Sequence, residues 1–221
     1  MNLTHSFSAL KMYENCPRRY MHQRINKEVK DEGSDASKYG ERIHEALELR
    51  IRDKSPLTDE TQKYEPLCTA LEQEAKGGKL LAEQKMTLNK NLMPTEWFAP
   101  DAWFRSILDV LMIHESQKKA FVLDWKTGKR RPDFTQMEIF ALQVFKHYPE
   151  VDSVTSALVW LRDYKMDTQV YKREQSNEMW ARIMARVNRI YESLEHDTWP
   201  PKPSGLCPWC PAKHICDYAQ L

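Results

Sequence analysis

Residues 121–128, with the sequence FVLDWKTG, constrain the fold more than any other part of the chain. Alternation with a period of two places three apolar side chains on one face of a β-strand and Val122, Asp124 and Lys126 on the other. An acid and an amine thus share a face that Val122 indicates is at least half buried. Burying ionised groups is costly unless they are paired or hold a metal ion. The segment therefore predicts a strand that carries an ion pair or a metal site.

The preceding segment, residues 102–113 (AWFRSILDVLMI), is predicted to be a long strand that forms a hairpin with the first. A polar turn centred between Ser116 and Gln117 would pair the strands antiparallel and place Asp124 opposite Asp109. Directly opposed residues have Cβ atoms roughly 4.5–5.5 Å apart, so the two carboxylates would repel each other. The hairpin therefore brings together two acids that need a compensating positive charge.

Two kinds of cation could supply that charge. A divalent ion between the carboxylates would turn their repulsion into a binding site, and hard oxygen ligands suit Mg²⁺ or Mn²⁺. The alternative is a salt bridge from Lys126 to either aspartate without any metal, because ion-pair networks perturb carboxylates as catalytic sites do. The hairpin alone leaves both interpretations open.

Size and composition limit the remaining possibilities. With 221 residues, 41% hydrophobic content and seven tryptophans, the chain can bury one sizeable core, so we expect a single domain over residues 1–221. The net charge of +1 gives no global attraction to nucleic acid. The apolar stretches are strand-sized and the N-terminus is polar, so we expect a cytoplasmic protein that does not enter a membrane. In a reducing compartment the five cysteines indicate metal ligation or free thiols, and Cys68, among leucines, is predicted to be a core thiol.

The order of the predicted elements indicates an α/β fold with a mixed central sheet flanked by helices. A helix between residues 134 and 148 would cross over and pair a strand at 154–161 parallel to the strand at 121–128. The other predicted elements are helices at 6–15, 36–52, 59–76 and 177–194 and strands at 79–88 and 168–171.

Several polar residues outside the hairpin are candidates for function. His44 follows Gly40 by one turn of the helix at 36–52, and a histidine in such a place is more often a surface or core residue than a ligand. Glu83 lies on the strand at 79–88. A basic loop follows the suspected site and could meet a phosphate backbone, although such loops are usually just solvated; its residues are Lys129, Arg130 and Arg131. Arginines along the helix at 177–194 favour a solvated surface over a DNA contact.

The C-terminal cysteines form the second strong signal. Cys207, Cys210 and Cys216 are spaced C-x2-C-x5-C in a proline-rich segment, which is typical of metal ligation and not of core packing. A tetrathiolate site needs a fourth sulfur, for which Cys16 is the best candidate. His214 could replace Cys16 in a zinc site, and the spacing does not separate zinc from an iron–sulfur cluster.

Taken together, these motifs resemble PD-(D/E)XK superfamily nucleases, in particular the RecB- and AddB-like iron–sulfur branch that includes CRISPR-associated adaptation exonucleases. The match spans almost the whole chain, and the motifs occur in the family's order. They are Cys16-Pro17-Arg18-Arg19-Tyr20, Gly40 to His44 (GxxxH), Ser106 to Asp109 (GxxD), Asp124-Trp125-Lys126-Thr127-Gly128 (DxKTG), Gln136 to Ala141 (QxxxYA) and the three C-terminal cysteines. Ser106 stands where glycine is usual, and Phe140 where tyrosine is usual.

The resemblance implies a restriction-endonuclease-like core and a set of site residues. Lys126 would orient the attacking water or stabilise charge on the phosphate, Gln136 would position Lys126 or the substrate, and Glu83 would be auxiliary. Mg²⁺ or Mn²⁺ would be bound by His44, Asp109, Asp124 and the main-chain carbonyl of Trp125. A [4Fe–4S] cluster joining residues 1–25 to residues 203–221, or zinc as the alternative, would be held by Cys16, Cys207, Cys210 and Cys216.

The implied function is hydrolysis of DNA phosphodiester bonds, most simply by an exonuclease that acts on single- or double-stranded ends in recombination, repair or phage DNA metabolism. The alternatives are an endonuclease, an end-trimming subunit of a larger complex, or a non-catalytic DNA-binding scaffold with a zinc site. The presence of His44, Asp109, Asp124 and Lys126 argues against the scaffold. Because the chain has no GxxxxGK[ST] motif, any helicase or recombination motor would be a separate chain.

Overall fold

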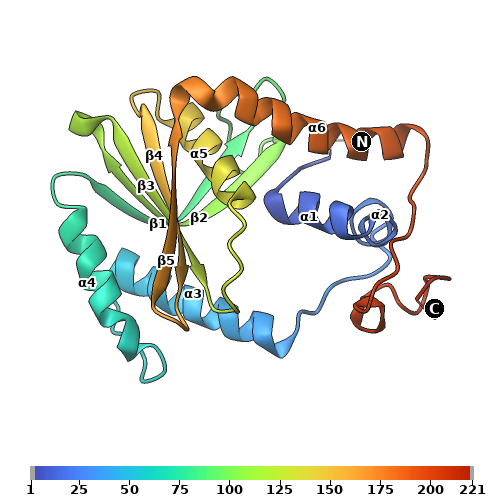
Figure 1. The fold of residues 1–221 in the computed structure, drawn as a ribbon, viewed down its shortest axis with the longest axis horizontal. Coiled ribbons are helices and arrows are strands. Elements are labelled where there is room, and N and C mark those ends of the chain that lie inside the picture. Colours follow the sequence, from blue (N-terminus) through green and yellow to red (C-terminus); the bar gives the residue numbers. More distant parts are fainter. Residues whose placement is uncertain (1–2, 220–221) are drawn as a thin grey trace. The chain divides into compact units, whose positions relative to one another are not determined.

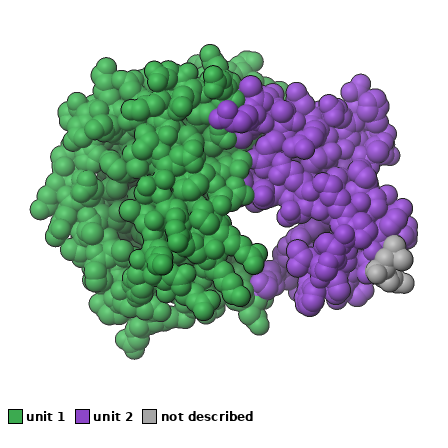
Figure 2. All heavy atoms as spheres, in the orientation of Figure 1, with its two compact units in different colours: residues 1–4, 35–180 green, residues 5–34, 181–221 purple. Residues whose placement is uncertain are grey.

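The computed structural model describes residues 3–219 of the chain (Figure 1). These residues form two compact units, which Figure 2 distinguishes by colour. Unit 1 consists of residues 35–180 together with residues 3 and 4, and unit 2 consists of residues 5–34 and 181–219. The single domain over residues 1–221 that the sequence predicts stays a prediction.

Unit 1 is built on a five-stranded sheet in which the strands lie in chain order. Strands β3 and β4 are parallel, and the other neighbours are antiparallel. The predicted mixed sheet and its crossover are therefore confirmed. The strands are β1 (Lys79–Leu88), β2 (Phe104–His114), β3 (Lys119–Lys126), β4 (Ser153–Trp160) and β5 (Lys165–Lys172).

The hairpin of β2 and β3 has the register that the turn predicted. Leu111 lies opposite Val122, and Val110 lies opposite Leu123. The ladder ends at this second pair, one position before the two aspartates would face each other. The side chains of Asp109 and Asp124 are therefore placed at the point where the two strands separate.

Helices cover both faces of this sheet. In Figure 1, α3 and α4 lie on one side and α5 lies on the other. Helix α4 is shorter than the predicted 59–76, because residues before it form a turn and Pro66 belongs in a first helical turn, where its missing N–H costs nothing. The bounds are α3 (Asp35–Asp53), α4 (Glu65–Glu74) and α5 (Thr135–His147).

The core between α3, α4 and the sheet is apolar. Ile43 and Leu47 of α3 pack with Leu123 and Trp125 of β3. Cys68 of α4 is completely buried in the same cluster, and burial raises the pKa of its thiol to about 11. This thiol therefore belongs to the core, as predicted.

Unit 2 contains the helices α1 (Phe7–Asn15) and α2 (Pro17–Tyr20), a π-helical turn (Met21–Ile25) and most of α6 (Ser176–Glu195). Ser6 caps α1, accepting a hydrogen bond from the main-chain N–H of Ala9 at 3.2 Å. Helix α6 was predicted to expose its arginines.

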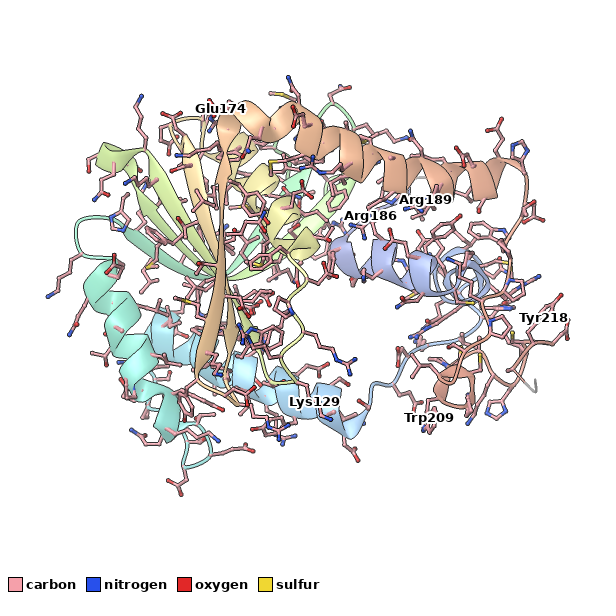
Figure 3. All side chains as sticks on the ribbon, viewed as in Figure 1. Lys129, Glu174, Arg186, Arg189, Trp209 and Tyr218 are labelled. Atoms are coloured by element: carbon pink, nitrogen blue, oxygen red, sulfur yellow. The ribbon has the colours of Figure 1, made fainter. Side chains whose placement is uncertain are left out.

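Two of those arginines instead contact α1. Arg186 and Arg189, labelled on α6 in Figure 3, both bind Glu14, at 2.6 Å and 3.3 Å. Within residues 3–219, no helix has the length and apolar character needed to cross a membrane.

Candidate active site

Strands β1 and β2 are distorted where they carry Glu83 and Asp109. Glu83 has a positive φ of 47°, while Ala82 and Gln84 on either side keep the regular pairing with β2. A left-handed conformation costs a residue other than glycine of order 1–3 kcal/mol, and such strain concentrates at functional sites. The distortion is therefore the first structural sign of a site.

This distortion turns both carboxylates toward α3. Ala82 and Val110 pack against the core beneath α3, yet their neighbours Glu83 and Asp109 also meet His44 of that helix. Adjacent residues of a regular strand point to opposite faces, so this arrangement requires the break in alternation. The break brings together two acids that regular strands would have separated from the histidine.

One group of potential metal ligands results. Ligand atoms of His44, Glu83 and Asp109 all lie within 4.8 Å of one another, and His44 Nδ1 is 3.4 Å from Asp109 Oδ2. His44 and Glu83 line an open pocket of about 640 Å³ together with Gly40 and Thr127. His44 and Glu83 are therefore accessible from this pocket, and Asp109 lies within reach of the same ion.

A second polar group lies beside the first. Lys126 Nζ is 2.5 Å from Asp124 Oδ2 and donates a hydrogen bond to Gln136 Oε1 at 2.9 Å. Gln136 in turn donates through Nε2 to Asp124 Oδ1 at 2.8 Å. The amide of α5 therefore holds both the acid and the amine of β3 in place, and the ion pair weighed from the sequence is present.

The main chain joins the two groups. Asp109 Oδ2 accepts a hydrogen bond of 2.7 Å from the N–H of Trp125, the residue between Asp124 and Lys126. Asp124 itself is outside the group formed by His44, Glu83 and Asp109. The geometry thus separates an ion-paired aspartate from a cluster of open ligands, whereas the sequence had predicted one shared set.

The electrostatics of both groups reflect burial and mutual repulsion. Burial raises the pKa of Glu83 to about 7, helped by the nearby charge of Asp109. Burial and Asp109 also raise the pKa of Asp124, which Lys126 lowers only in part. For His44, burial lowers the pKa, but the hydrogen bond and charge of Asp109 outweigh it and the net pKa is raised. The site is an acidic cluster that lacks sufficient positive charge.

The absent side chain of Gly40 allows α3 to approach the loop that follows β3. A Cβ atom added at Gly40 would lie 3.1 Å from Thr127 Oγ1, closer than ordinary van der Waals contact. Gly40 is one helical turn from His44, and Thr127 directly follows Lys126. The close approach at Gly40 therefore contributes to the separation between the histidine and the ion pair.

The residues present fit a divalent cation. Asp124 is buried, and its Oδ2 atom has Lys126 Nζ at 2.5 Å as its charged neighbour. The donor set of carboxylate oxygens and one imidazole nitrogen suits Mn²⁺ and Mg²⁺. The acids are close enough to repel one another, and an ion would relieve that repulsion.

One contact of the basic loop had no clear signal in the sequence. Arg130 of the predicted DNA-binding loop forms an ion pair with Asp167 of β5, with Nε 2.8 Å from Oδ2, and Trp160 also donates to that carboxylate at 2.7 Å. Lys129, labelled in Figure 3, and Arg131 are exposed. Only the tertiary fold reveals that one of the three basic residues has a structural partner.

In unit 2, the four predicted cysteine ligands line one pocket. Cys16, Cys207, Cys210 and Cys216 all contribute to it. Main-chain N–H groups of Lys202 and Ser204 donate to the sulfurs of Cys16 and Cys207, at 3.5 Å and 3.3 Å. His214, the alternative ligand, is exposed and is not among the residues that line this pocket.

The spacing of these sulfurs is wider than that of a closed zinc site. Among the four, all of which lie in the described part of the chain, no three sulfur atoms are within 4.8 Å of one another. Zn–S bonds of about 2.3 Å would place tetrahedral ligands about 3.8 Å apart. The pocket gathers the four cysteines, and the cluster itself stays a prediction.

Comparison with known proteins gives a family and a fold. The model of the PD-(D/E)XK nuclease superfamily matches residues 4–217. Two solved structures are similar in fold, and each is 13% identical in sequence to this chain. Each alignment covers 99% of this chain and 88% of the solved chain. They are a proposed exonuclease from Eubacterium rectale, with a TM-score of 0.54, and the protein SSO0001, with a TM-score of 0.50. No curated protein matches the sequence.

Proposed function

Because the chain belongs to the PD-(D/E)XK nuclease superfamily, we propose that it is a metal-dependent deoxyribonuclease that acts on DNA ends. One observation carries the proposal: the buried Asp124, held by Lys126 and Gln136, lies directly beside the open ligand group of His44, Glu83 and Asp109. A cation site can activate water, and a positioned amine next to it can stabilise charge on the phosphate.

The cation would be held by His44, Glu83 and Asp109, with the Asp124 carboxylate and the carbonyl of Trp125 as further candidates. When bound, Mg²⁺ or Mn²⁺ lowers the pKa of a water molecule and neutralises charge on the phosphate. Glu83 thus moves from the auxiliary role expected from the sequence to a proposed ligand. Its strained backbone supports this role, because nothing in the fold of β1 alone requires it.

Lys126 is the proposed catalytic amine. Its side chain is 31% exposed, so the ammonium can reach a phosphate oxygen or the attacking water while Asp124 and Gln136 fix its position. A preorganised positive charge next to the scissile phosphate is worth more than one that must be ordered during the reaction. Gln136 is a positioning residue, since it contacts Lys126 and Asp124 and need not touch the substrate.

We also propose that the substrate is DNA and that cleavage proceeds from DNA ends. The Eubacterium rectale protein of similar fold is described as a proposed exonuclease, and we extend that mode to this chain. Recombination, repair and phage DNA metabolism are the processes that use such an activity. An endonuclease, or an end-trimming subunit that works with a separate helicase, remains the alternative within the same chemistry.

Digestion of end-labelled and circular DNA, single- and double-stranded, with Mg²⁺ or Mn²⁺ tests this function. We expect linear DNA to be shortened from its ends and covalently closed circles to be spared. Asp124→Ala should abolish the activity, whereas Asp152→Ala, at an exposed carboxylate on the opposite end of the sheet, should not. Cleaved circles would indicate the endonuclease, and equal digestion by wild type and Asp124→Ala would overturn the enzyme.

For unit 2 we propose a [4Fe–4S] cluster on Cys16, Cys207, Cys210 and Cys216, as in the RecB- and AddB-like branch. The shared pocket and the N–H groups directed at two sulfurs support it, since such hydrogen bonds stabilise thiolates in iron–sulfur sites. The wide spacing of the sulfurs favours separate irons over a single zinc ion.

Iron, sulfide and zinc contents of protein purified without oxygen distinguish these metals. We expect iron and sulfide in equal amounts, lost in Cys16→Ala and retained in the control Cys68→Ala, whose thiol lies in the core of unit 1. A colourless protein with one zinc ion per chain would replace the cluster with the zinc site.

A further inference from the structure

A compact group of aromatic and basic side chains lies on β1, β2 and the loop between them. Arg105 of β2 lies against two rings, its guanidinium carbon 5.3 Å from the centroid of Trp97 and 5.9 Å from that of Phe98. Lys85 of β1 places its ammonium 5.7 Å from the Trp97 ring. We call Lys85, Trp97, Phe98 and Arg105 the aromatic platform.

The platform is unusually exposed for its composition. Phe98 is 85% exposed, and the apolar side chains of Met93 and Ile107 nearby are 58% and 38% exposed. Single exposed apolar residues are common, but an exposed ring held against a cation, with further exposed apolar residues on the same loop and strand, indicates a binding surface. A phenylalanine in this position gains almost nothing from burial, and one cation–π contact contributes about 0.5–1 kcal/mol at an exposed site.

Among the described residues, the cations of the platform form no salt bridge, and the only acid on which one of them acts is Glu83 of the same strand, whose pKa the charge of Lys85 lowers. Neither Lys85 nor Arg105 forms an ion pair with a carboxylate in the part of the chain that the structure describes, and Arg105 Nε is buried without a hydrogen-bond acceptor. Other arginines of unit 1 behave differently: Arg50 binds Glu65 and Glu72, and Arg130 binds Asp167. The charge on the platform is thus available to an anion.

The loop that presents the rings is held in place. Thr95 donates its main-chain N–H to Thr87 O at 3.0 Å, and the side chain of Asn89 accepts from the N–H of Met93 at 3.1 Å. Asp101, an acid of the same loop, is engaged by the Thr95 hydroxyl at 3.0 Å. A ring on a braced loop is preorganised for stacking, because little conformational freedom remains to be lost on binding.

The platform continues directly from the ligand group of the active site. Lys85 lies two residues after Glu83 on β1, opposite Ile107, which lies two residues before Asp109 on β2. The platform therefore adjoins the ligand group along both strands. At about 3.3 Å per residue, Arg105 is about 13 Å from Asp109 along the strand.

We propose that this platform binds the single-stranded end of the DNA substrate, with bases stacked on Phe98 and Trp97 and the phosphates near Lys85 and Arg105. An exposed ring beside unpaired cations matches the chemistry of single-stranded DNA, in which every base offers a π-face and every linkage a negative charge. A duplex hides the faces of all its base pairs except the terminal ones, so successive bases cannot stack in this way. The proposal rests on the proposed nuclease function, because it assigns the strand leading to that site.

The test measures binding of a fluorescent single-stranded oligonucleotide in EDTA, which prevents cleavage. Base–aromatic stacking is worth about 1–3 kcal/mol per base, so Phe98→Ala should weaken binding about tenfold. Phe98→Trp should restore it. Tyr164→Ala is the matched control, since Tyr164 is 60% exposed on the β4–β5 turn, away from the platform, and its loss should leave affinity unchanged.

An oligonucleotide of the same length with abasic sites separates stacking from charge. We expect Phe98→Ala to have no effect on the abasic strand, while Arg105→Ala weakens both strands and reduces the salt dependence of binding. Equal affinity of wild type and Phe98→Ala for the intact strand would overturn the platform and indicate that the surface meets something other than DNA.

A minimal substrate, a thymidine phosphodiester too short to reach Phe98, keeps this proposal distinct from the nuclease itself. The Phe98→Ala protein should hydrolyse it at the wild-type rate with Mn²⁺. If wild type cannot hydrolyse any substrate but binding still depends on Phe98, the nuclease function fails and the platform stands. If wild type digests DNA and Phe98→Ala digests and binds it equally well, only the platform fails.

Discussion

The active site of unit 1 and the cysteine pocket of unit 2 are ordered by different forces. Asp109, Asp124 and Lys126 project from strands whose neighbours form an apolar core, so the site is formed before any ion arrives. In residues 200–219 only Ala212 is buried, while Leu206 and Trp209 are 73% and 77% exposed. Hydrophobic burial therefore cannot order the cysteine segment.

A metal ion would therefore have a different role in each unit. In unit 1 an ion would relieve repulsion between acids that the fold already holds together, and it would supply chemistry. In unit 2 a metal would replace the missing core, because its binding free energy is available for folding. Removing metal should thus affect activity in the first case and structure in the second.

The largest expected effect lies in unit 2. Cys210→Ala should remove the bound metal entirely, and with it an apparent binding free energy of the order of 10 kcal/mol. Residues 200–219 should then become sensitive to limited proteolysis, while the thermal unfolding of the sheet in unit 1 changes little. A Cys210→Ala protein that keeps both its metal and its protease resistance would show that metal binding does not order this segment of unit 2.

The next effect concerns the catalytic amine. Lys126→Ala should lower kcat about a thousandfold, by loss of a positioned charge in a partly desolvated site. Its Tm should stay within a few degrees of wild type, since the ammonium contributes little to a core that Trp125 and Leu123 dominate. Lys165→Ala, on an exposed strand of the same sheet, is the control. Parallel losses of Tm and kcat would show that the site is not formed independently of its chemistry.

Metal binding in unit 1 should depend on pH. The pKa of Glu83 is raised from 4.5 to about 7, so between these values the folded protein binds a proton that the unfolded chain releases. In the absence of metal, this group makes the folded state less stable as pH rises from about 4.5 to 7. Metal must displace the proton, so affinity for Mn²⁺ should fall up to about tenfold per pH unit below 7.

Titration calorimetry at pH 6 and pH 8 measures this dependence. Glu83→Gln should bind Mn²⁺ more weakly at pH 8 and lose most of the pH dependence. An unchanged slope in this variant would assign the proton to another group, with His44 the first to examine, because its pKa is also raised.

The smallest effect sharpens the link between helix and strand within unit 1. Gly40→Ala places a Cβ atom 3.1 Å from Thr127 Oγ1 and should reduce kcat a few-fold by shifting His44 from the ion pair. Stability should not fall in parallel, since alanine favours a helix over glycine by up to about 1 kcal/mol. The double variant with Thr127→Ala should recover activity. No recovery would mean that the contact does not position the site.

Much of this architecture could be predicted from residues close together in the chain. The turn at Ser116 and Gln117 fixed the hairpin register, which the pairing of Leu111 with Val122 confirms. The alternation of β3 correctly placed Asp124 and Lys126 on one face, where they form an ion pair. These predictions succeeded because strand alternation and hairpin register are local properties.

The role of Glu83 was beyond such reasoning. Regular alternation places it on the face opposite Ala82, and only its positive φ brings it to His44. The aromatic platform could not be predicted either, because Trp97 and Phe98 come from a loop, while Lys85 and Arg105 come from two strands. No spacing in the sequence connects them.

The sequence by itself determined the strands, the hairpin register and the residue types of two proposed metal-binding groups, because these depend on periodicity and on side-chain chemistry. Only the tertiary structure decided which acids share a site. It separated Asp124, held by Lys126 and Gln136, from the open ligands His44, Glu83 and Asp109. The physical reason is that a strained backbone at one residue is stabilised by distant packing, and the local sequence carries no record of that packing.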